Sequence, residues 1–77
     1  MEGSTRHTLR ILDQYGDTKL TYDPTDQDAV RDVERRFNAL MARSFVAFDV
    51  SSQPGRVITA FDPEATEIII APRIAGG

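Results

Sequence analysis

The sequence of 77 residues has no cysteine, a single histidine and a single lysine. Without cysteine, the chain itself can form no disulfide bond, no thiolate metal site and no cysteine nucleophile. His7 has no second histidine or cysteine to complete a metal site, and no nucleophile–histidine–acid arrangement can be built around it. We therefore expect neither a metal site nor a catalytic residue, hence no enzyme, and we expect His7 to lie on the surface of a strand.

Long apolar runs are also missing. No segment is long enough to span a bilayer, and residues 1–5 lack the apolar core of a signal peptide, which together predict a cytoplasmic protein with no membrane partner. The formal net charge of −3 argues against a nucleic-acid partner. The length is that of one small domain, and we find no internal repeat.

Periodic apolar residues predict five strands and one helix. The strands are expected over residues 7–12, 18–22, 45–50, 56–61 and 67–71, and the helix over residues 26–43. The helix has one apolar face, made by Val30, Val33, Phe37, Leu40 and Met41. Thr25 is expected to cap its start, and Ser44 must end it without the usual glycine.

The order strand, strand, helix, strand, strand, strand predicts a two-layer α+β domain over residues 7–72. Residues 1–6 are expected to form a flexible N-terminus, and residues 73–77 a flexible C-terminal tail. Three consecutive isoleucines, residues 68–70, make the last strand the most apolar. We therefore expect it at the centre of a mixed sheet, parallel to the first strand, with the helix covering one face only.

The other face of the sheet is predicted to carry exposed apolar side chains. The residues expected to face the helix are Leu9, Ile11, Leu20, Tyr22, Val46, Phe48, Ile68 and Ile70. Alternation then turns their neighbours outward, namely Arg10, Leu12, Phe45, Ala47, Ile69 and Ala71. An apolar patch rimmed by Arg10 and Arg73 indicates a docking surface for another protein. The alternatives are a register error of one residue and self-association through this face.

The tail after the last strand ends in two glycines. Pro72 removes a backbone donor and stops the sheet ladder before the tail begins. Because they have no Cβ, Gly76 and Gly77 fit a channel that is too narrow for any other residue. We interpret the carboxylate of Gly77 as the functional group; a chance diglycine or a frayed end is the alternative.

This order of elements, with a long helix and an apolar last strand that leads into Gly-Gly, resembles the β-grasp fold of ubiquitin-like proteins. The resemblance runs from His7 to Gly77. In ubiquitin-like modifiers an arginine often stands three residues before the diglycine and is followed by an aliphatic residue; here these are Arg73 and Ile74. Ala75 stands where ubiquitin has a basic residue, and the chain looks closer to small bacterial ubiquitin-like proteins.

The resemblance implies a protein modifier that binds no cofactor itself. A ThiF-type, ubiquitin-activating-like enzyme would consume ATP to adenylate Gly77, and a conjugating enzyme would carry it as a thioester to a target protein. A JAB-type metalloprotease would be a further partner. Gly76 and Gly77 would enter the active sites, and the preceding residues, Arg73, Ile74 and Ala75, would be recognised. Lys19, the single lysine, would be the possible acceptor for chain formation.

Two other functions stay open. The segment from Glu67 to Gly77 also resembles the end of ThiS- and MoaD-like sulfur carriers, which have an acidic residue, an apolar strand, a proline and a short tail to Gly-Gly. In a sulfur carrier the terminal carboxylate becomes a thiocarboxylate. The third possibility is a non-covalent β-grasp binding module that uses the sheet face. The first two functions need the terminal glycines, whereas the third should survive deletion of the tail.

Overall fold

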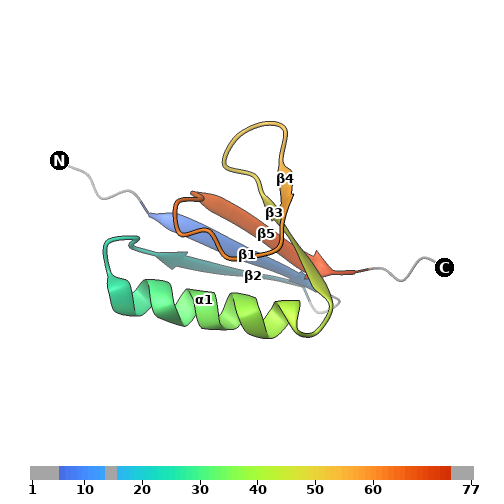
Figure 1. The fold of residues 1–77 in the computed structure, drawn as a ribbon, viewed down its shortest axis with the longest axis horizontal. Helices are drawn as coiled ribbons and strands as arrows, with labels where there is room; N and C mark the ends of the chain where they lie inside the picture. Colours follow the sequence, from blue (N-terminus) through green and yellow to red (C-terminus); the bar gives the residue numbers. More distant parts are fainter. Residues whose placement is uncertain (1–5, 14–15, 74–77) are drawn as a thin grey trace.

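In the part of the chain that the structure describes, five strands form one mixed sheet and one helix packs on one of its faces (Figure 1). The computed structural model describes residues 6–13 and 16–73; of the ends expected to be flexible, residues 1–6 and 73–77, all but Arg6 and Arg73 lie outside these ranges. The elements are β1 (His7–Asp13), β2 (Gly16–Tyr22), α1 (Gln27–Met41), β3 (Phe45–Asp49), β4 (Arg56–Ile58) and β5 (Glu67–Pro72). The predicted order is confirmed, although α1 and β4 are shorter than expected.

The last strand lies at the centre of the sheet, as predicted. The strand order is β2-β1-β5-β3-β4, and β5 pairs with β1 in parallel and with β3 in the antiparallel direction. Leu9 stands beside Ile68 and Ile11 beside Ile70 in the β1–β5 register. These four side chains share the face that α1 covers, because alternate residues of a strand point to the same side.

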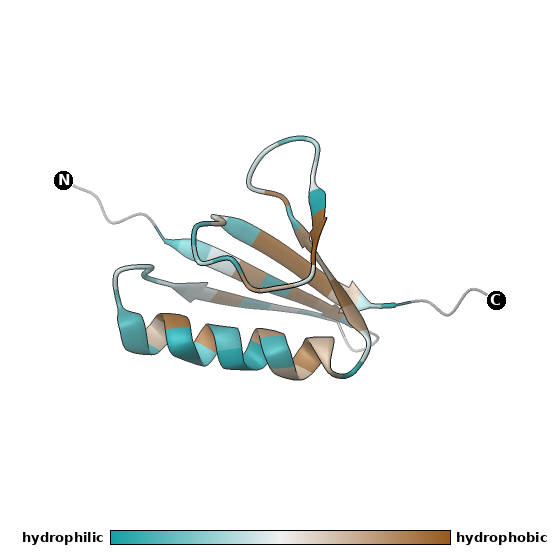
Figure 2. Ribbon diagram, in the orientation of Figure 1, coloured by the Kyte–Doolittle hydropathy of each residue, from teal (hydrophilic) through white to brown (hydrophobic). Residues whose placement is uncertain are grey.

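The core lies between the sheet and the apolar stripe of α1. Figure 2 shows strongly hydrophobic ribbon segments in β3, β4 and β5, whereas α1 alternates between hydrophobic and hydrophilic residues. The buried apolar residues are Leu9, Ile11, Tyr22, Val33, Phe37, Ala47, Ala65, Ile68 and Ile70. Burial of a side chain as large as Phe37 stabilises the fold by about 1.5–3 kcal/mol. Within the described residues, α1 is neither long nor apolar enough to cross a membrane.

The cap of α1 differs by one residue from the expectation. Asp26, not Thr25, is the N-cap, and its Oδ1 accepts the backbone N–H groups of Asp28 at 3.1 Å and Ala29 at 3.2 Å. Thr25 instead donates its hydroxyl and its backbone N–H to Asp23 Oδ1. These two bonds lower the pKa of Asp23. The prediction was wrong because the preceding turn engages Thr25 first.

His7 is buried, which corrects the prediction of a surface histidine. Only 7% of it is exposed, because it shares the helix-covered face with Leu9 and stands opposite Tyr22. The two rings meet edge to face with 5.6 Å between their centroids. Phe61 continues the aromatic cluster, with centroids 6.4 Å from Tyr22 and 5.7 Å from Phe37. Burial, and to a smaller extent the charge of Asp62, raises the pKa of Tyr22.

A small polar network joins the end of β3 to the start of β5. The backbone N–H of Ser51 donates to Asp49 Oδ1 at 2.9 Å. The Ser51 hydroxyl oxygen accepts the N–H groups of Thr66 at 2.7 Å and Glu67 at 3.2 Å. Hydrogen bonds from the side chain and backbone of Ser51 lower the pKa of Asp49, which is only 8% exposed. The ionised carboxylate therefore helps to hold the two strands together.

We predict that Asp49→Asn reduces the acid sensitivity of the fold. Because the folded-state pKa of Asp49 lies below its unfolded value, the ionised group stabilises the fold above the unfolded pKa. That contribution is lost as the pH falls through the folded pKa. Urea unfolding between about pH 6 and about pH 2 should show a larger loss of unfolding free energy in the wild type than in Asp49→Asn. Equal losses would contradict this prediction.

Candidate functional site

The chain leaves the domain beside the turn between α1 and β3. β5 ends at Pro72, which stands opposite Phe45 in the β3–β5 register. The next residue, Arg73, is exposed, and its backbone N–H donates to the carbonyl of Ser44 at 3.1 Å. We call Ser44 and Arg73 the tail base. The other predicted tail residues, Ile74, Ala75, Gly76 and Gly77, lie outside the described residues.

Ser44 has an unusual backbone conformation that holds the tail base. Its φ is 69°, in the left-handed region where glycine is favoured. Its N–H donates to the carbonyl of Met41 at 3.2 Å, and its own carbonyl accepts Arg73. The expectation that Ser44 ends the helix turn without a glycine is confirmed. A left-handed residue other than glycine costs about 1–2 kcal/mol, so the surrounding hydrogen bonds must outweigh this strain.

Four residues predicted for the uncovered face of the sheet lie there. Arg10 stands beside Ile69 in the β1–β5 register, and both belong to the side of the sheet opposite the buried Leu9 and Ile70. By the same alternation the register places two more predicted residues on this face, Leu12 and Ala71. Lys19, the possible acceptor, is exposed and stands opposite Arg10 on the same face.

The predicted facing of β3 was wrong by one residue. Ala47 is fully buried and stands opposite Ile70, while Phe45 packs against the core. Both were expected on the uncovered face, and both in fact belong to the helix-covered face. Val46 and Phe48, which were expected to face the helix, point to the uncovered side instead. This is the register error of one residue that the sequence had left open.

The packing of α1 against the sheet explains this reversal. β3 has apolar residues on both of its sides, so local alternation does not say which side is buried. The buried side carries the small Ala47 and ends in Asp49, a composition that resembles an exposed side. The small side chain of Ala47 leaves room for α1, which contacts β3. Asp49 can be buried on this side because its carboxylate accepts a hydrogen bond from the backbone N–H of Ser51. A tertiary contact thus overrides the apparent hydrophobic pattern.

The face of the sheet opposite α1 therefore carries an apolar patch. Its residues differ in part from those predicted. The open-face patch consists of Leu12, Val46, Phe48, Val57, Ile69 and Ala71. Phe48 is at its centre, opposite Ile69 on β5 and Val57 on β4. Val57 is 61% exposed and Leu12 is 36% exposed. The other four residues of the patch are half-buried. Apolar side chains that are at least partly exposed and lie together on one face of a sheet favour protein docking.

Charged residues border the open-face patch on the β1 side. Arg10 Nη2 lies 3.8 Å from Glu67 Oε2, and both side chains are more than a third exposed. An ion pair this exposed contributes at most about 1 kcal/mol to stability. Arg10 Nε is buried without a hydrogen-bond partner. This border can therefore offer charge complementarity to a protein that covers the patch.

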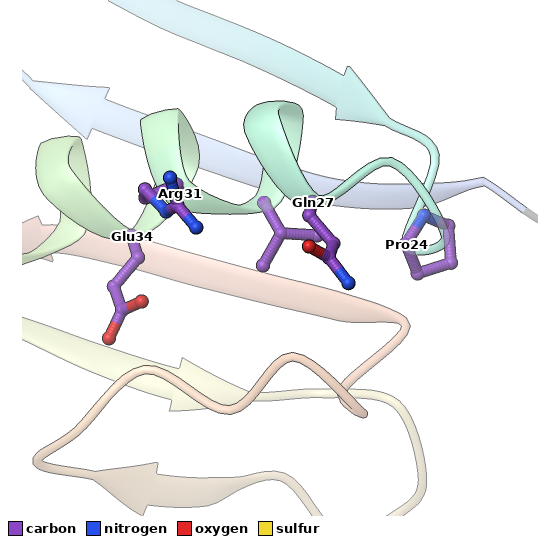
Figure 3. Close-up of a pocket in the computed structure, with 5 residues that line it drawn as sticks. Pro24, Gln27, Arg31 and Glu34 are labelled. Atoms are coloured by element: carbon purple, nitrogen blue, oxygen red, sulfur yellow. The ribbon is translucent and has the colours of Figure 1, made fainter.

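A shallow hollow lies along the first turns of α1 (Figure 3). Its volume is about 240 Å³, and its lining residues are Pro24, Gln27, Val30, Arg31 and Glu34. It combines two apolar side chains with charges of both signs, so it does not indicate a class of ligand. In residues 6–13 and 16–73 no group of three or more histidine, aspartate or glutamate side chains could hold a metal ion.

Comparison with protein-family models, with curated proteins and with solved structures found no match to this chain. The tail base and the open-face patch are therefore the two features from which a function can be inferred.

We predict that Ser44→Gly raises the unfolding free energy by up to about 1 kcal/mol, because glycine adopts a positive φ without strain. Ser52→Gly is the matched control. Ser52 lies in the exposed loop after β3, and Ser44 is the one residue other than glycine with a positive φ in the described part of the chain. Chemical denaturation of both variants should therefore give changes of opposite sign. If both variants lose stability, Ser44 is not strained by its positive φ.

Proposed function

We propose that this chain is a β-grasp protein of the ubiquitin-like kind and that it serves as a protein modifier activated at Gly77. Three features of the described fold support this proposal: the sheet order β2-β1-β5-β3-β4, the parallel pairing of β1 with β5, and the helix between β2 and β3. The observation that carries the proposal is the tail base. The central strand delivers the chain to the surface at Arg73, four residues before Gly77.

The tail base limits where an enzyme that acts on Gly77 can bind. An extended chain covers at most about 3.6 Å per residue, so Gly77 reaches no further than about 14 Å from Arg73. An enzyme whose active site encloses Gly77 would therefore have to contact the tail base or the α1–β3 turn. Arg43 and Arg73 are both exposed there, which favours an acidic rim on the partner.

In the proposed chemistry the chain is the substrate and supplies no catalytic group. A carboxylate is a poor acyl donor, because its leaving group would be oxide. The Gly77 carboxylate attacks the α-phosphate of ATP, which gives an acyl-adenylate and releases pyrophosphate. A cysteine of the activating enzyme displaces AMP to form a thioester, and an amine of the target protein then displaces the cysteine thiol. A sulfur carrier would share the adenylation step; sulfide supplied by a partner would then displace AMP, which takes one carboxylate oxygen with it, and leave a thiocarboxylate.

The open-face patch supplies the second contact in this proposal. A short tail gives few contacts, whereas protein recognition needs a buried apolar centre with a polar border. Phe48 and Ile69 provide the centre, and Arg10 and Glu67 provide the border. We assign this face to docking of the activating or conjugating enzyme, so the enzyme holds the domain while the tail enters its active site.

We predict that the terminal glycines are required for conjugation. Gly77→Val adds a branched side chain where the active-site channel must be narrow, and a misplacement of about 1 Å at a reacting centre can lower a rate about 100-fold. N-terminally tagged wild type, Gly77→Val and a copy without Gly77 should be compared by blotting a lysate of the native host. Heavier bands that resist reducing agent should appear with the wild type alone.

The control for this experiment is Gly3→Val, which makes the same substitution far from the tail in the sequence. Its band pattern should match that of the wild type. If only free wild-type protein appears, and its intact mass shows one oxygen exchanged for sulfur, the sulfur-carrier function replaces the modifier. Unmodified protein in every sample would overturn both and leave a binding module that acts through the open-face patch.

We predict further that Phe48→Arg lowers the yield of conjugates about tenfold or more, because truncation or charging of a central apolar contact is the most damaging change at an interface. Ala39→Arg is the matched control, because it adds the same side chain on the exposed side of α1. Thermal unfolding should show both variants folded. Equal conjugation by the two variants would rule out docking through the open-face patch.

A further inference from the structure

The two edges of the sheet differ in length and exposure. β4 forms one edge with only three residues, whereas β2 forms the other with seven residues that all pair with β1. The outer side of an edge strand presents backbone N–H and C=O groups that can pair with another strand. Proteins protect such edges with short strands, prolines, bulges or charges. β2 is long and pairs without interruption, and its only such safeguards are the two charged residues Asp17 and Lys19.

The charged residues of β2 have no oppositely charged partner within the described part of one chain. Lys19 stands directly opposite Arg10, and like charges in opposite positions of an antiparallel pair are destabilising. Arg10 has Glu67 on its other side, at 3.8 Å. In the described part of the chain neither Lys19 nor Asp17 forms an ion pair. Lys19 therefore lacks an acidic neighbour on the outer side of β2.

We propose that β2 pairs with β2 of a second copy of this chain, antiparallel and centred on Thr18. In this register Asp17 stands opposite Lys19 of the second copy, and the two-fold axis repeats the pair. Both residues lie on the uncovered face, because they stand opposite Leu12 and Arg10. Their side chains therefore meet on one side of the joint sheet, about 5 Å apart at Cβ.

The neighbouring two-fold registers are less favourable. A centre at Asp17 sets two aspartates opposite each other, and a centre at Lys19 sets two lysines opposite each other. A centre at Leu20 leaves Lys19 opposite Thr21 without an acid. Of these four registers, the centre at Thr18 alone places an acid opposite Lys19 of each copy, so the charges favour this register.

The pairing leaves the tail base and the open-face patch accessible, whereas it engages Lys19, the possible acceptor for chain formation. The axis is perpendicular to the sheet, so both helices lie on one side and both open-face patches on the other. β1 separates the paired β2 edge from β5, and therefore from the tail base. The inference does not depend on the proposed function, and each can fail without the other.

Charge reversal tests the pairing directly. Sedimentation velocity of the full chain at low salt, from about 10 µM to about 1 mM, should show a reversible dimer. Asp17→Lys places lysines at positions 17 and 19, and Lys19→Asp places aspartates at both. Two copies of the same variant therefore repel each other in the proposed register. Each should dimerise at least about tenfold more weakly than the wild type.

Mixtures of the variants separate this register from other modes of association. An equimolar mixture of Asp17→Lys and Lys19→Asp should recover dimers, because each aspartate again faces a lysine. The double variant with both changes should also recover them. Circular dichroism should show every variant folded, since both side chains are exposed. A wild type that stays monomeric, single variants that dimerise normally, or a mixture without recovery would each overturn the proposal.

Discussion

The pairing of β5 with β1 and β3 is the constraint on which the rest of the fold depends. β1–β2 and β3–β4 are two antiparallel pairs that do not touch each other in the sheet order. β5 joins them, and its two residues that face the helix, Ile68 and Ile70, are exposed by 1% or less. Without this strand, α1 would have no continuous apolar face to pack on.

The same strand also sets both features of the candidate site. Ile68 and Ile70 point into the core, while Ile69 between them points into the open-face patch. The strand then runs on to Pro72 and presents Arg73 at the carbonyl of Ser44. Because β5 is held on both sides, the tail base has a defined position on the domain and a defined relation to the open-face patch.

The open face is divided between two kinds of surface. On the β3 and β4 side it is apolar, with Phe48 and Val57 standing opposite each other. On the β1 and β2 side it is charged, with Arg10 beside Lys19. Apolar area favours a tight protein contact, whereas alternating charge at an edge favours selection of register. The two proposed contacts use these different parts, so a dimer could still engage an enzyme.

Residue order and periodicity alone determined most of the architecture. The six elements, their order, the helix stripe and the central place of β5 follow from short-range patterns, because helices and strands bury side chains at fixed periods. The proposed role of Gly76 and Gly77 rests on the sequence alone, because both residues lie outside the described part of the chain. The hydrogen bond that ties Arg73 to Ser44 had no signal in the sequence, since it joins residues far apart along the chain.

Tertiary structure alone decided the facing of β3 and the burial of His7. Both sides of β3 are apolar, so its facing is set by pairing with β5, which places Ala47 opposite Ile70, and by the close approach of α1. His7 is buried because it continues the covered side of β1 and meets Tyr22 across the strand pair. In each case a side chain's environment depends on a neighbour that is distant in sequence, and local periodicity carries no information about that neighbour.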